Sequence, residues 1–233
     1  MQRNLNGSVA IVTGAGRGTG AAVARALALA GARVTVNDVN PDRTERMAQE
    51  ITRAGGEALA VQADVSNKFQ CVKLVEATRA RWGQLDILVN AAHIRPRATV
   101  LKMDEWDWNR CLEVNVKGVF FMSQLCGRVM DDSKRGGTIV NLISEAGVEI
   151  PLEDHAAFCA SQAAVLGFAR ECAREFADYG VQVHTLVHGA AGDQEADEAS
   201  DRHEQIAHAV LALWAGDGQT HAATPPLRDL EQG

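Results

Sequence analysis

Short apolar runs alternate with longer stretches of mixed polarity along most of the chain. Each run holds six or seven residues and is rich in valine, isoleucine and leucine, which is typical of strands buried on both faces. In the longer stretches, apolar residues recur at the spacing of a helix. The pattern predicts strands at 8–13, 33–38, 58–63, 85–90, 137–143 and 181–187, and helices at 19–30, 42–54, 68–82, about 104–131 and 155–178.

This regular alternation predicts the fold class. Consecutive strands separated by helices run parallel, and the helices then cover both faces of the sheet. We therefore expect an α/β fold with one doubly wound parallel sheet of the Rossmann type. The 233 residues suit one domain, so residues 1–233 are expected to form a single unit. After residue 188 the pattern weakens: 189–202 is acidic and rich in small residues, and 205–215 again favours a helix.

Composition excludes several classes of protein. With 46% hydrophobic and 23% charged residues, the chain is neither disordered nor fibrous. A net charge of −7 argues against nucleic-acid binding, and neither a membrane span nor a secretory signal is predicted. Five cysteines stand singly, which predicts reduced thiols and a cytoplasmic location. Cysteines and histidines show no metal-ligand spacing, so no metal is expected.

A glycine-rich turn follows the first predicted strand. The segment Thr13-Gly14-Ala15-Gly16-Arg17-Gly18-Thr19-Gly20 leads directly into the first predicted helix. Glycines allow a tight turn and a close backbone approach, and a helix N-terminus offers free N–H groups to a pyrophosphate. Because the turn joins a strand to a helix, it favours dinucleotide binding over an ordinary glycine turn. The expected cofactor-binding residues here are Gly14, Arg17, Gly18 and Gly20.

Asp38 closes the second predicted strand, eighteen residues beyond Gly20. A carboxylate there accepts hydrogen bonds from the ribose hydroxyls of an adenosine and repels a 2′-phosphate, so it favours NAD over NADP. Arg17 favours a phosphate instead, and the plainer interpretation of Asp38 is a loop acid or a helix cap. Because Asp38 would stand directly against the 2′-phosphate, NAD is the cofactor that we expect.

Six segments carry a further pattern when they are taken in order: TGAGRGTG (13–20), Asp38, ADV (63–65), NAAH (90–93), VNVKG (114–118) and IVNLIS (139–144). With these segments the chain resembles the short-chain dehydrogenase/reductase (SDR) family over nearly its whole length. The resemblance implies hydride transfer between a nicotinamide and a carbon–oxygen bond. It places Asp64 and Val65 at the adenine and Asn90 beside the cofactor. It also implies a proton-relay asparagine at Asn115 and a substrate-orienting serine at Ser144.

The catalytic pair of that family is absent. The resemblance implies a tyrosine as general acid and base with a lysine four residues later, but these positions hold Phe158 and Gln162. Gln162 retains a hydrogen-bond donor for a ribose, whereas Phe158 has no proton to transfer. The single tyrosine, Tyr179, lies at the far end of the same predicted helix, and no lysine follows Lys134. Loss of a positioned general acid lowers a rate by roughly 10²–10⁴-fold.

Further departures gather on the nicotinamide side. His93 stands where the family has a glycine, and His188-Gly189 replaces Pro-Gly. Asp193 replaces a threonine that contacts the carboxamide, and the substrate lid expected at about 189–204 is short. The adenosine side therefore matches the family, whereas the nicotinamide side has diverged.

A few side chains are candidates for a replacement acid. His155 lies three residues before Phe158, so the two share a helix face, and an imidazole titrates near about 6.5. The plainer interpretation makes His155 a residue at the start of its helix. Glu145, which follows Ser144, and Cys159 are further candidates, although a packing role suits Cys159 better.

Three functional hypotheses follow. In the first, the chain is a pseudoenzyme, a structural or regulatory subunit of a hetero-oligomeric NAD-dependent dehydrogenase. In the second, it is an active alcohol or carbonyl oxidoreductase that uses His155 as an atypical acid, with Ser144 positioning the substrate. In the third, it is a non-redox enzyme or a ligand sensor. The missing pair favours the first, and the resemblance implies assembly through the helices at about 104–131 and 155–178, with an active paralogue as one partner.

Overall fold

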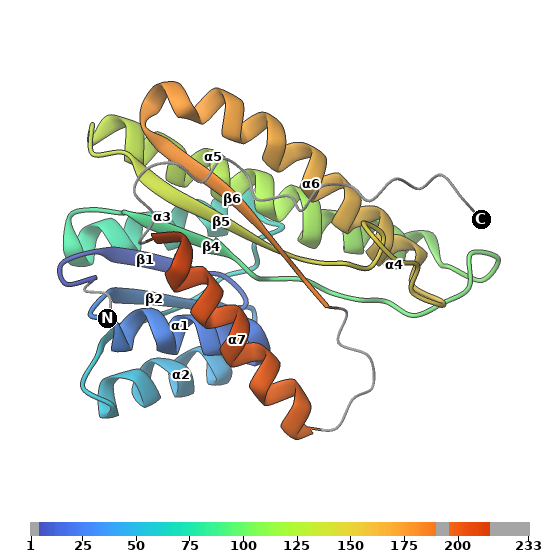
Figure 1. The fold of residues 1–233 in the computed structure, drawn as a ribbon, viewed down its shortest axis with the longest axis horizontal. Coiled ribbons are helices and arrows are strands. Elements are labelled where there is room, and N and C mark those ends of the chain that lie inside the picture. Colours follow the sequence, from blue (N-terminus) through green and yellow to red (C-terminus); the bar gives the residue numbers. More distant parts are fainter. Residues whose placement is uncertain (1–4, 190–195, 215–233) are drawn as a thin grey trace.

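Six parallel strands form the sheet at the centre of a computed structural model that describes residues 5–189 and 196–214 (Figure 1). Their order across the sheet is β3-β2-β1-β4-β5-β6, and every neighbouring pair runs parallel. The doubly wound Rossmann-type sheet is therefore confirmed. The strands are β1 (Val9–Val12), β2 (Arg33–Asp38), β3 (Glu57–Gln62), β4 (Ile87–Asn90), β5 (Gly137–Ser144) and β6 (Val181–His188).

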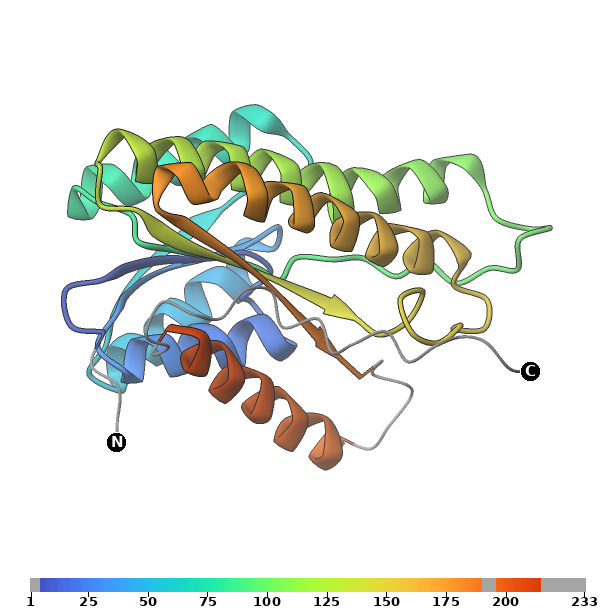
Figure 2. The ribbon, with the colours of Figure 1, turned by 45° about the horizontal axis from the view of Figure 1, so that its top comes forward.

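Helices cover both faces of this sheet. They are α1 (Gly18–Leu29), α2 (Pro41–Arg53), α3 (Lys68–Trp82), α4 (Glu105–Leu112), α5 (Gly118–Asp132), α6 (Ala156–Phe176) and α7 (Ala196–Trp214). α1, α2 and α7 pack on one face, where they share an apolar cluster with Val12 of β1 (Figures 1 and 2). α3, α5 and α6 pack on the other face, around Ile11. Neighbouring residues of β1 thus enter different clusters, which explains why this strand is apolar throughout.

Asparagine side chains fix where two helices begin. Asn40 Oδ1 accepts a hydrogen bond from the Arg43 N–H at 2.9 Å, and Pro41 occupies the first turn of α2. Asn67 Oδ1 accepts bonds from the first turn of α3 at 3.0 and 3.2 Å. Asparagine is a preferred N-cap and proline suits the first helical position. The loops that follow β2 and β3 are consequently short and hold the ends of these strands in place.

The long helical region predicted at about 104–131 is helical from Glu105 to Asp132, and a π-helical turn at Glu113–Lys117 joins α4 to α5 within it. Such turns are frequent at functional sites. The turn contains Asn115, whose side-chain amide pairs with the backbone of Ile94. Its Nδ2 donates to the Ile94 carbonyl at 2.9 Å, and its Oδ1 accepts from the Ile94 N–H at 2.8 Å. These two bonds hold the loop after β4 against the helices.

The C-terminal part differs from the prediction. α7 begins at Ala196, whereas the sequence predicted its start at 205, so the region expected to form a lid at about 189–204 is partly helical. Residues 196–204 have little hydrophobic periodicity, but they are rich in alanine and glutamate, which favour a helix. Asp193 lies outside the described residues. In the described parts, no helix is both long and apolar enough to cross a bilayer.

Candidate functional site

A cleft of about 370 Å³ lies at the carboxyl ends of the strands, and we call it the central cleft. It includes the point between β1 and β4 from which the sheet winds in opposite directions, where ligands of open α/β sheets bind. Asn90, Asn115, His155 and Gln162 are not among its lining residues. The other predicted site residues line it, namely Gly14, Arg17, Gly18, Gly20, Asp38, Asp64, Val65, Ser144 and Phe158.

The glycine turn approaches the loop after β4 closely. Gly14 has a φ of +64°, and a Cβ added there would lie 2.6 Å from the Ala92 Cα. Thr13 Oγ1 ties the same two segments together, since it accepts bonds from the Ala91 and Ala92 N–H groups at 3.1 and 3.2 Å. The side chain of the N-cap residue Arg17 makes no capping bond to the first N–H groups of α1. The turn therefore fits a phosphate group.

Asp38 is buried between the glycine turn and α2. Its Oδ2 accepts from the Gly16 N–H at 3.2 Å, and its Oδ1 accepts from the Asn40 N–H at 2.9 Å. The side chain of Asn40, not that of Asp38, caps α2. Two backbone donors thus fix the carboxylate at the edge of the central cleft, where it can accept bonds from a ribose.

Asn37 is a site residue that the sequence analysis missed. Its Nδ2 donates to the carbonyls of Val61 and Ala63 at 3.1 and 3.0 Å, which fixes the orientation of the amide. Its Oδ1 is buried, has no hydrogen-bond partner among the described residues, and belongs to a side chain that lines the central cleft. A buried acceptor without a donor is costly, so this atom suits an N–H or O–H group of a ligand. The polar residue in the apolar run RVTVND was the available signal.

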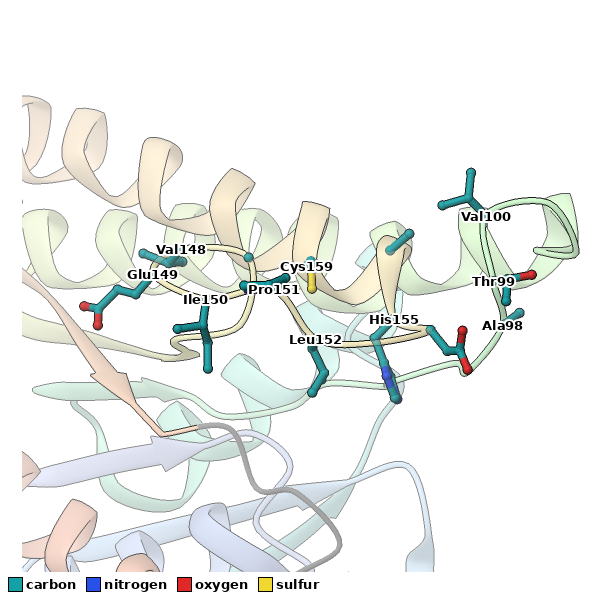
Figure 3. A pocket seen from close by; sticks show the side chains of 13 residues that line it. Ala98, Thr99, Val100, Val148, Glu149, Ile150, Pro151, Leu152, His155 and Cys159 are labelled. Carbon is teal, nitrogen blue, oxygen red and sulfur yellow. The ribbon is translucent and has the colours of Figure 1, made fainter. Parts of the chain in front are cut away.

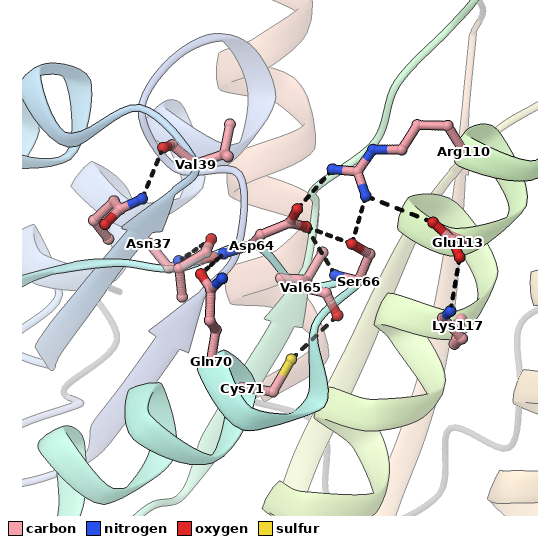
Figure 4. A network of polar contacts seen from close by, with 12 residues as sticks. Asn37, Val39, Asp64, Val65, Ser66, Gln70, Cys71, Arg110, Glu113 and Lys117 are labelled. Atoms are coloured by element: carbon pink, nitrogen blue, oxygen red, sulfur yellow. Dashed lines mark hydrogen bonds and ion pairs between the residues drawn. The ribbon is translucent and has the colours of Figure 1, made fainter. Parts of the chain in front are cut away.

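Asp64 is held by a network that reaches α4 (Figure 4). Its Oδ1 accepts from the N–H and Oγ of Ser66 at 2.9 and 2.8 Å, and its Oδ2 accepts from Arg110 Nη2 at 2.7 Å. Arg110 also donates to Ser66 Oγ and pairs with Glu113 at 3.8 Å. Partial burial raises the pKa of Asp64, but the bonds from Ser66 and Arg110 outweigh it and hold the pKa below its ordinary value. The part of the cleft that Asp64 lines is therefore held in place by an ion pair with Arg110.

Removing this brace is expected to destabilise the protein in a pH-dependent way. Arg110→Gln should lower the free energy of unfolding at pH 7 by about 1–2 kcal/mol, since it deletes charge-assisted bonds that are only partly exposed. Because the pKa of Asp64 lies lower in the folded chain than the unfolded value of about 3.9, the pair stabilises fully above that pH and loses its contribution as the pH falls through the folded-state value. Urea unfolding across pH should show wild type and variant converging in acid. A constant difference would contradict the pairing, and Arg79→Gln, in an exposed pair, is the control.

The position of the family lysine holds a buried structural glutamine. Gln162 Oε1 accepts from the Ser144 N–H at 2.8 Å, and its Nε2 donates to Ser161 Oγ at 3.2 Å. Asn115 Nδ2 also donates to Ser161 Oγ, at 2.9 Å. The residues predicted to form a proton relay are thus joined in one internal hydrogen-bond chain below the central cleft. The expected bond from Gln162 to a ribose does not match this arrangement, because Gln162 is buried and does not line the cleft.

Gln162→Ala is expected to lower the free energy of unfolding by about 1–3 kcal/mol, because the buried Ser144 N–H would lose its acceptor. Gln182→Ala is the matched control, since Gln182 lies on β6 with an exposed side chain. Chemical denaturation of both variants measures the difference. Equal stability of the two variants would show that the bond to Ser144 contributes nothing.

Phe158 and Ser144 both line the central cleft. The ring of His93 lies against that of Phe158, with centroids 5.9 Å apart and the planes tilted by 50°. Ser144 Oγ accepts from the Ala146 N–H at 3.1 Å. Asn90, which was expected beside the cofactor, is buried instead and donates to Asn141 Oδ1 at 2.9 Å. The imidazole of His93 therefore lies beside the position of the missing tyrosine.

His155 lines a different pocket, of about 600 Å³, between residues 98–100 and 147–159 (Figure 3). Its Nδ1 lies 2.5 Å from the Glu153 carbonyl, and Figure 3 shows its side chain and that of Leu152 pointing to the same side. Cys159 lines this outer pocket as well. The structure thus does not bring His155 together with Ser144 in one cavity. Tyr179 is exposed at the far end of α6, beyond reach of the cleft.

Comparison with known proteins gives matches over most of the chain. The family model described as short chain dehydrogenase matches residues 8–204. An uncharacterized oxidoreductase of Thermotoga maritima is 36% identical over 80% of this chain and 72% of its own. D-threitol dehydrogenase of Mycolicibacterium smegmatis is 36% identical over 78% of this chain and 69% of its own.

Solved structures match the fold as well. A dehydrogenase/reductase from Sinorhizobium meliloti 1021 superposes with a TM-score of 0.84 at 29% identity, covering 94% of this chain and 92% of that one. A gluconate 5-dehydrogenase from Burkholderia cenocepacia J2315, in complex with NADP and tartrate, gives a TM-score of 0.76 at 32% identity, covering 83% and 78%. The fold described above is shared with these proteins.

Proposed function

Because this chain belongs to the short-chain dehydrogenase family, we propose that it is a non-catalytic member that binds NAD(H) and serves as a structural or regulatory subunit beside an active dehydrogenase. The observation that carries the proposal is that the side chain of Gln162 forms hydrogen bonds with Ser144 and Ser161. Gln162 carries no charge that could lower the pKa of a neighbouring acid, and both ends of its amide are used in bonds within the protein. The same proposal places the subunit in the cytoplasm, where its five free cysteines stay reduced.

The described residues fit the nucleotide half of such a ligand. Asp38 is positioned for the adenosine ribose, Asn37 Oδ1 for a donor of the adenine or ribose, and the start of α1 for the phosphates. A bound nicotinamide supplies or accepts a hydride, but reduction of a carbonyl also needs a proton donor beside the oxygen. Phe158 has no such proton. We therefore expect binding with little or no turnover.

Asp38→Asn tests the choice of NAD. Asparagine keeps one accepting oxygen but loses the charge that disfavours a 2′-phosphate, so NADH affinity is expected to fall about tenfold, which is about 1.4 kcal/mol. NADPH affinity should rise relative to NADH because Arg17 and Arg43 also line the cleft. Calorimetry with both nucleotides measures the ratio, and Asp42→Asn, an exposed acid in the first turn of α2, is the control. An unchanged ratio would remove Asp38 as the selecting residue.

The partner surface that we propose lies on α4, α5 and α6. α5 and α6 run side by side (Figure 2), and Phe120 packs edge-on against Phe168 with centroids 6.0 Å apart. Phe120 is 38% exposed and Trp106 is 69% exposed, so aromatic surface remains uncovered in the single chain. Aromatic residues are enriched at interfaces. We propose that this surface binds a complete member of the same family. The active site of that partner contains the tyrosine and the lysine that this chain lacks.

Co-purification tests the subunit role. The tagged chain, expressed in its own cells, is expected to carry a second, complete family member, and Phe120→Asp should release it while NADH binding persists. Purified alone, the chain should leave a panel of polyols and sugar acids unchanged. That panel follows from relatives named for D-threitol, sorbitol, galactitol and 2-dehydro-3-deoxy-D-gluconate. A homo-oligomer that turns over any of these compounds with NAD would overturn the subunit proposal.

The second candidate function is an active oxidoreductase with an imidazole as its acid. The observation that favours it is His93, which contacts Phe158 in the cleft that also contains Ser144. If turnover is found, His93→Gln should abolish it, whereas His155→Ala should not, because His155 lines the outer pocket.

A further inference from the structure

Three histidines from separate parts of the chain line the central cleft. His93 follows β4, His188 ends β6, and His203 lies on α7. The ring of His203 stands over the glycine turn, with its Cε1 3.8 Å from the point that a Cβ on Gly18 would occupy. We call these residues the histidine cluster. Among the described residues, no group of histidine, cysteine and carboxylate side chains has the arrangement of a metal site.

Backbone carbonyls orient two of the rings. His93 Nδ1 lies 3.1 Å from the Ala91 carbonyl, and His188 Nδ1 lies 3.1 Å from the Gly189 carbonyl. A carbonyl oxygen only accepts, so Nδ1 carries the hydrogen in each ring. The basic nitrogen of each neutral ring is consequently Nε2, which is where a further proton binds.

The surroundings of the cluster keep it neutral at pH 7. Loss of hydration is the largest cause that lowers the pKa of each of the three imidazoles. Nearby cations lower the pKa values further: Arg17 and Arg95 act on His93, and Arg202 acts on the other two.

His93 and His203 also lower the pKa of His188, which shows that the rings are electrostatic neighbours. Glu145 places a carboxylate near the cluster. Its Oε1 and Arg202 Nη1 both lie close to the position that a Cβ on Gly189 would occupy. α6 contributes the uncharged ring of Phe158.

We propose that the central cleft binds a diphosphate-bridged adenine nucleotide together with protons, which the histidine cluster takes up. This inference rests on the proposed nucleotide binding and adds a regulatory property to it. The start of α1, where phosphates are expected, lies directly beneath His203. Negative phosphates beside an imidazole favour its charged form, so they raise its pKa on binding. The ligand therefore binds the protonated protein more tightly, and the affinity rises as the pH falls from about 7.5 toward 6.

Calorimetry in buffers of different ionisation enthalpy tests the coupling. With NADH or ADP-ribose at about pH 6.5, the observed heat should change with the buffer in proportion to the protons bound, on the order of half a proton or more. Adenosine, which has no phosphate, should show no such dependence. His203→Gln should reduce both the proton uptake and the rise in affinity at low pH. His208→Gln is the matched control, because His208 lies on the same helix but lines the groove between α1 and α7.

The outcomes separate this inference from the proposed function. If NADH binds with a heat independent of buffer, nucleotide binding stands and the proton coupling is overturned. If no nucleotide binds at any pH, both are overturned. If His203→Gln and His208→Gln reduce proton uptake equally, the coupling belongs to the fold as a whole and the histidine cluster is overturned as its source. His188→Gln provides a second variant should His203→Gln fail to fold.

Discussion

Replacing Phe158 by tyrosine and Gln162 by lysine together is expected to raise the rate of nicotinamide-dependent oxidoreduction by about 10²–10⁴-fold. Phe158 lines the central cleft beside Ser144, so a hydroxyl added to its ring enters the same cavity. An unaided tyrosine titrates near about 10, which is too high for efficient transfer at pH 7. A lysine four residues later lies on the same helix face, and its charge lowers the tyrosine pKa. Phe158→Tyr alone should therefore recover only part of the rate.

The double variant carries a structural cost that has to be measured beside its rate. Gln162→Lys removes the acceptor of the Ser144 N–H and buries a cation, so the variant should be less stable than wild type. NADH oxidation with the polyol and sugar-acid panel measures the rate, and denaturation confirms the folded state. If the folded double variant binds NADH but stays at the wild-type rate, the defect extends beyond the pair. His93, which packs against Phe158, is then the next residue to replace, with glycine.

The two halves of the site differ in how they are held. Asp38 and Asn37 are fixed by bonds to backbone groups of neighbouring strands and turns. The polar groups of Ser144 and Gln162 bond each other or nearby residues and belong to an internal network. A binding cleft and a self-bonded network at the family's catalytic positions are thus compatible within one structure.

The sheet was predictable because its strands are apolar and lie between helices. All six strands end within two residues of their predicted limits, and α3 matches its prediction at both ends. Asn67 caps the N-terminus of α3, and Gly83 ends the helix in the left-handed conformation. Both residues are recognisable signals in the sequence. The π turn at Glu113–Lys117 has no comparable signal, since its residues suit an ordinary helix. The early start of α7 was missed because helix propensity without periodicity is a weak predictor.

The site was predictable only where a local motif carries it. The glycine turn, Asp38, Asp64 and Ser144 reach the central cleft as their motifs implied. Arg110 binds Asp64, which lies 46 positions earlier in the sequence, and no local sequence pattern predicts such a pair. His203 likewise reaches the cleft through the packing of α7 on α1. The direction of Gln162, inward to Ser144, depends on a hydrogen bond between distant residues and was not available from the sequence.

Gly14→Ala is expected to lower the free energy of unfolding by about 2–5 kcal/mol and to abolish NADH binding. At its φ of +64° an alanine is strained by about 1–2 kcal/mol. A Cβ only 2.6 Å from the Ala92 Cα adds an overpacking cost of about 1–3 kcal/mol. Gly55→Ala separates the two causes, because Gly55 has a φ of +90° but no atom within 4 Å of an added Cβ. Urea unfolding should show the larger loss at Gly14, and equal losses would mean that the turn relaxes and that its contact with Ala92 does not constrain the cleft.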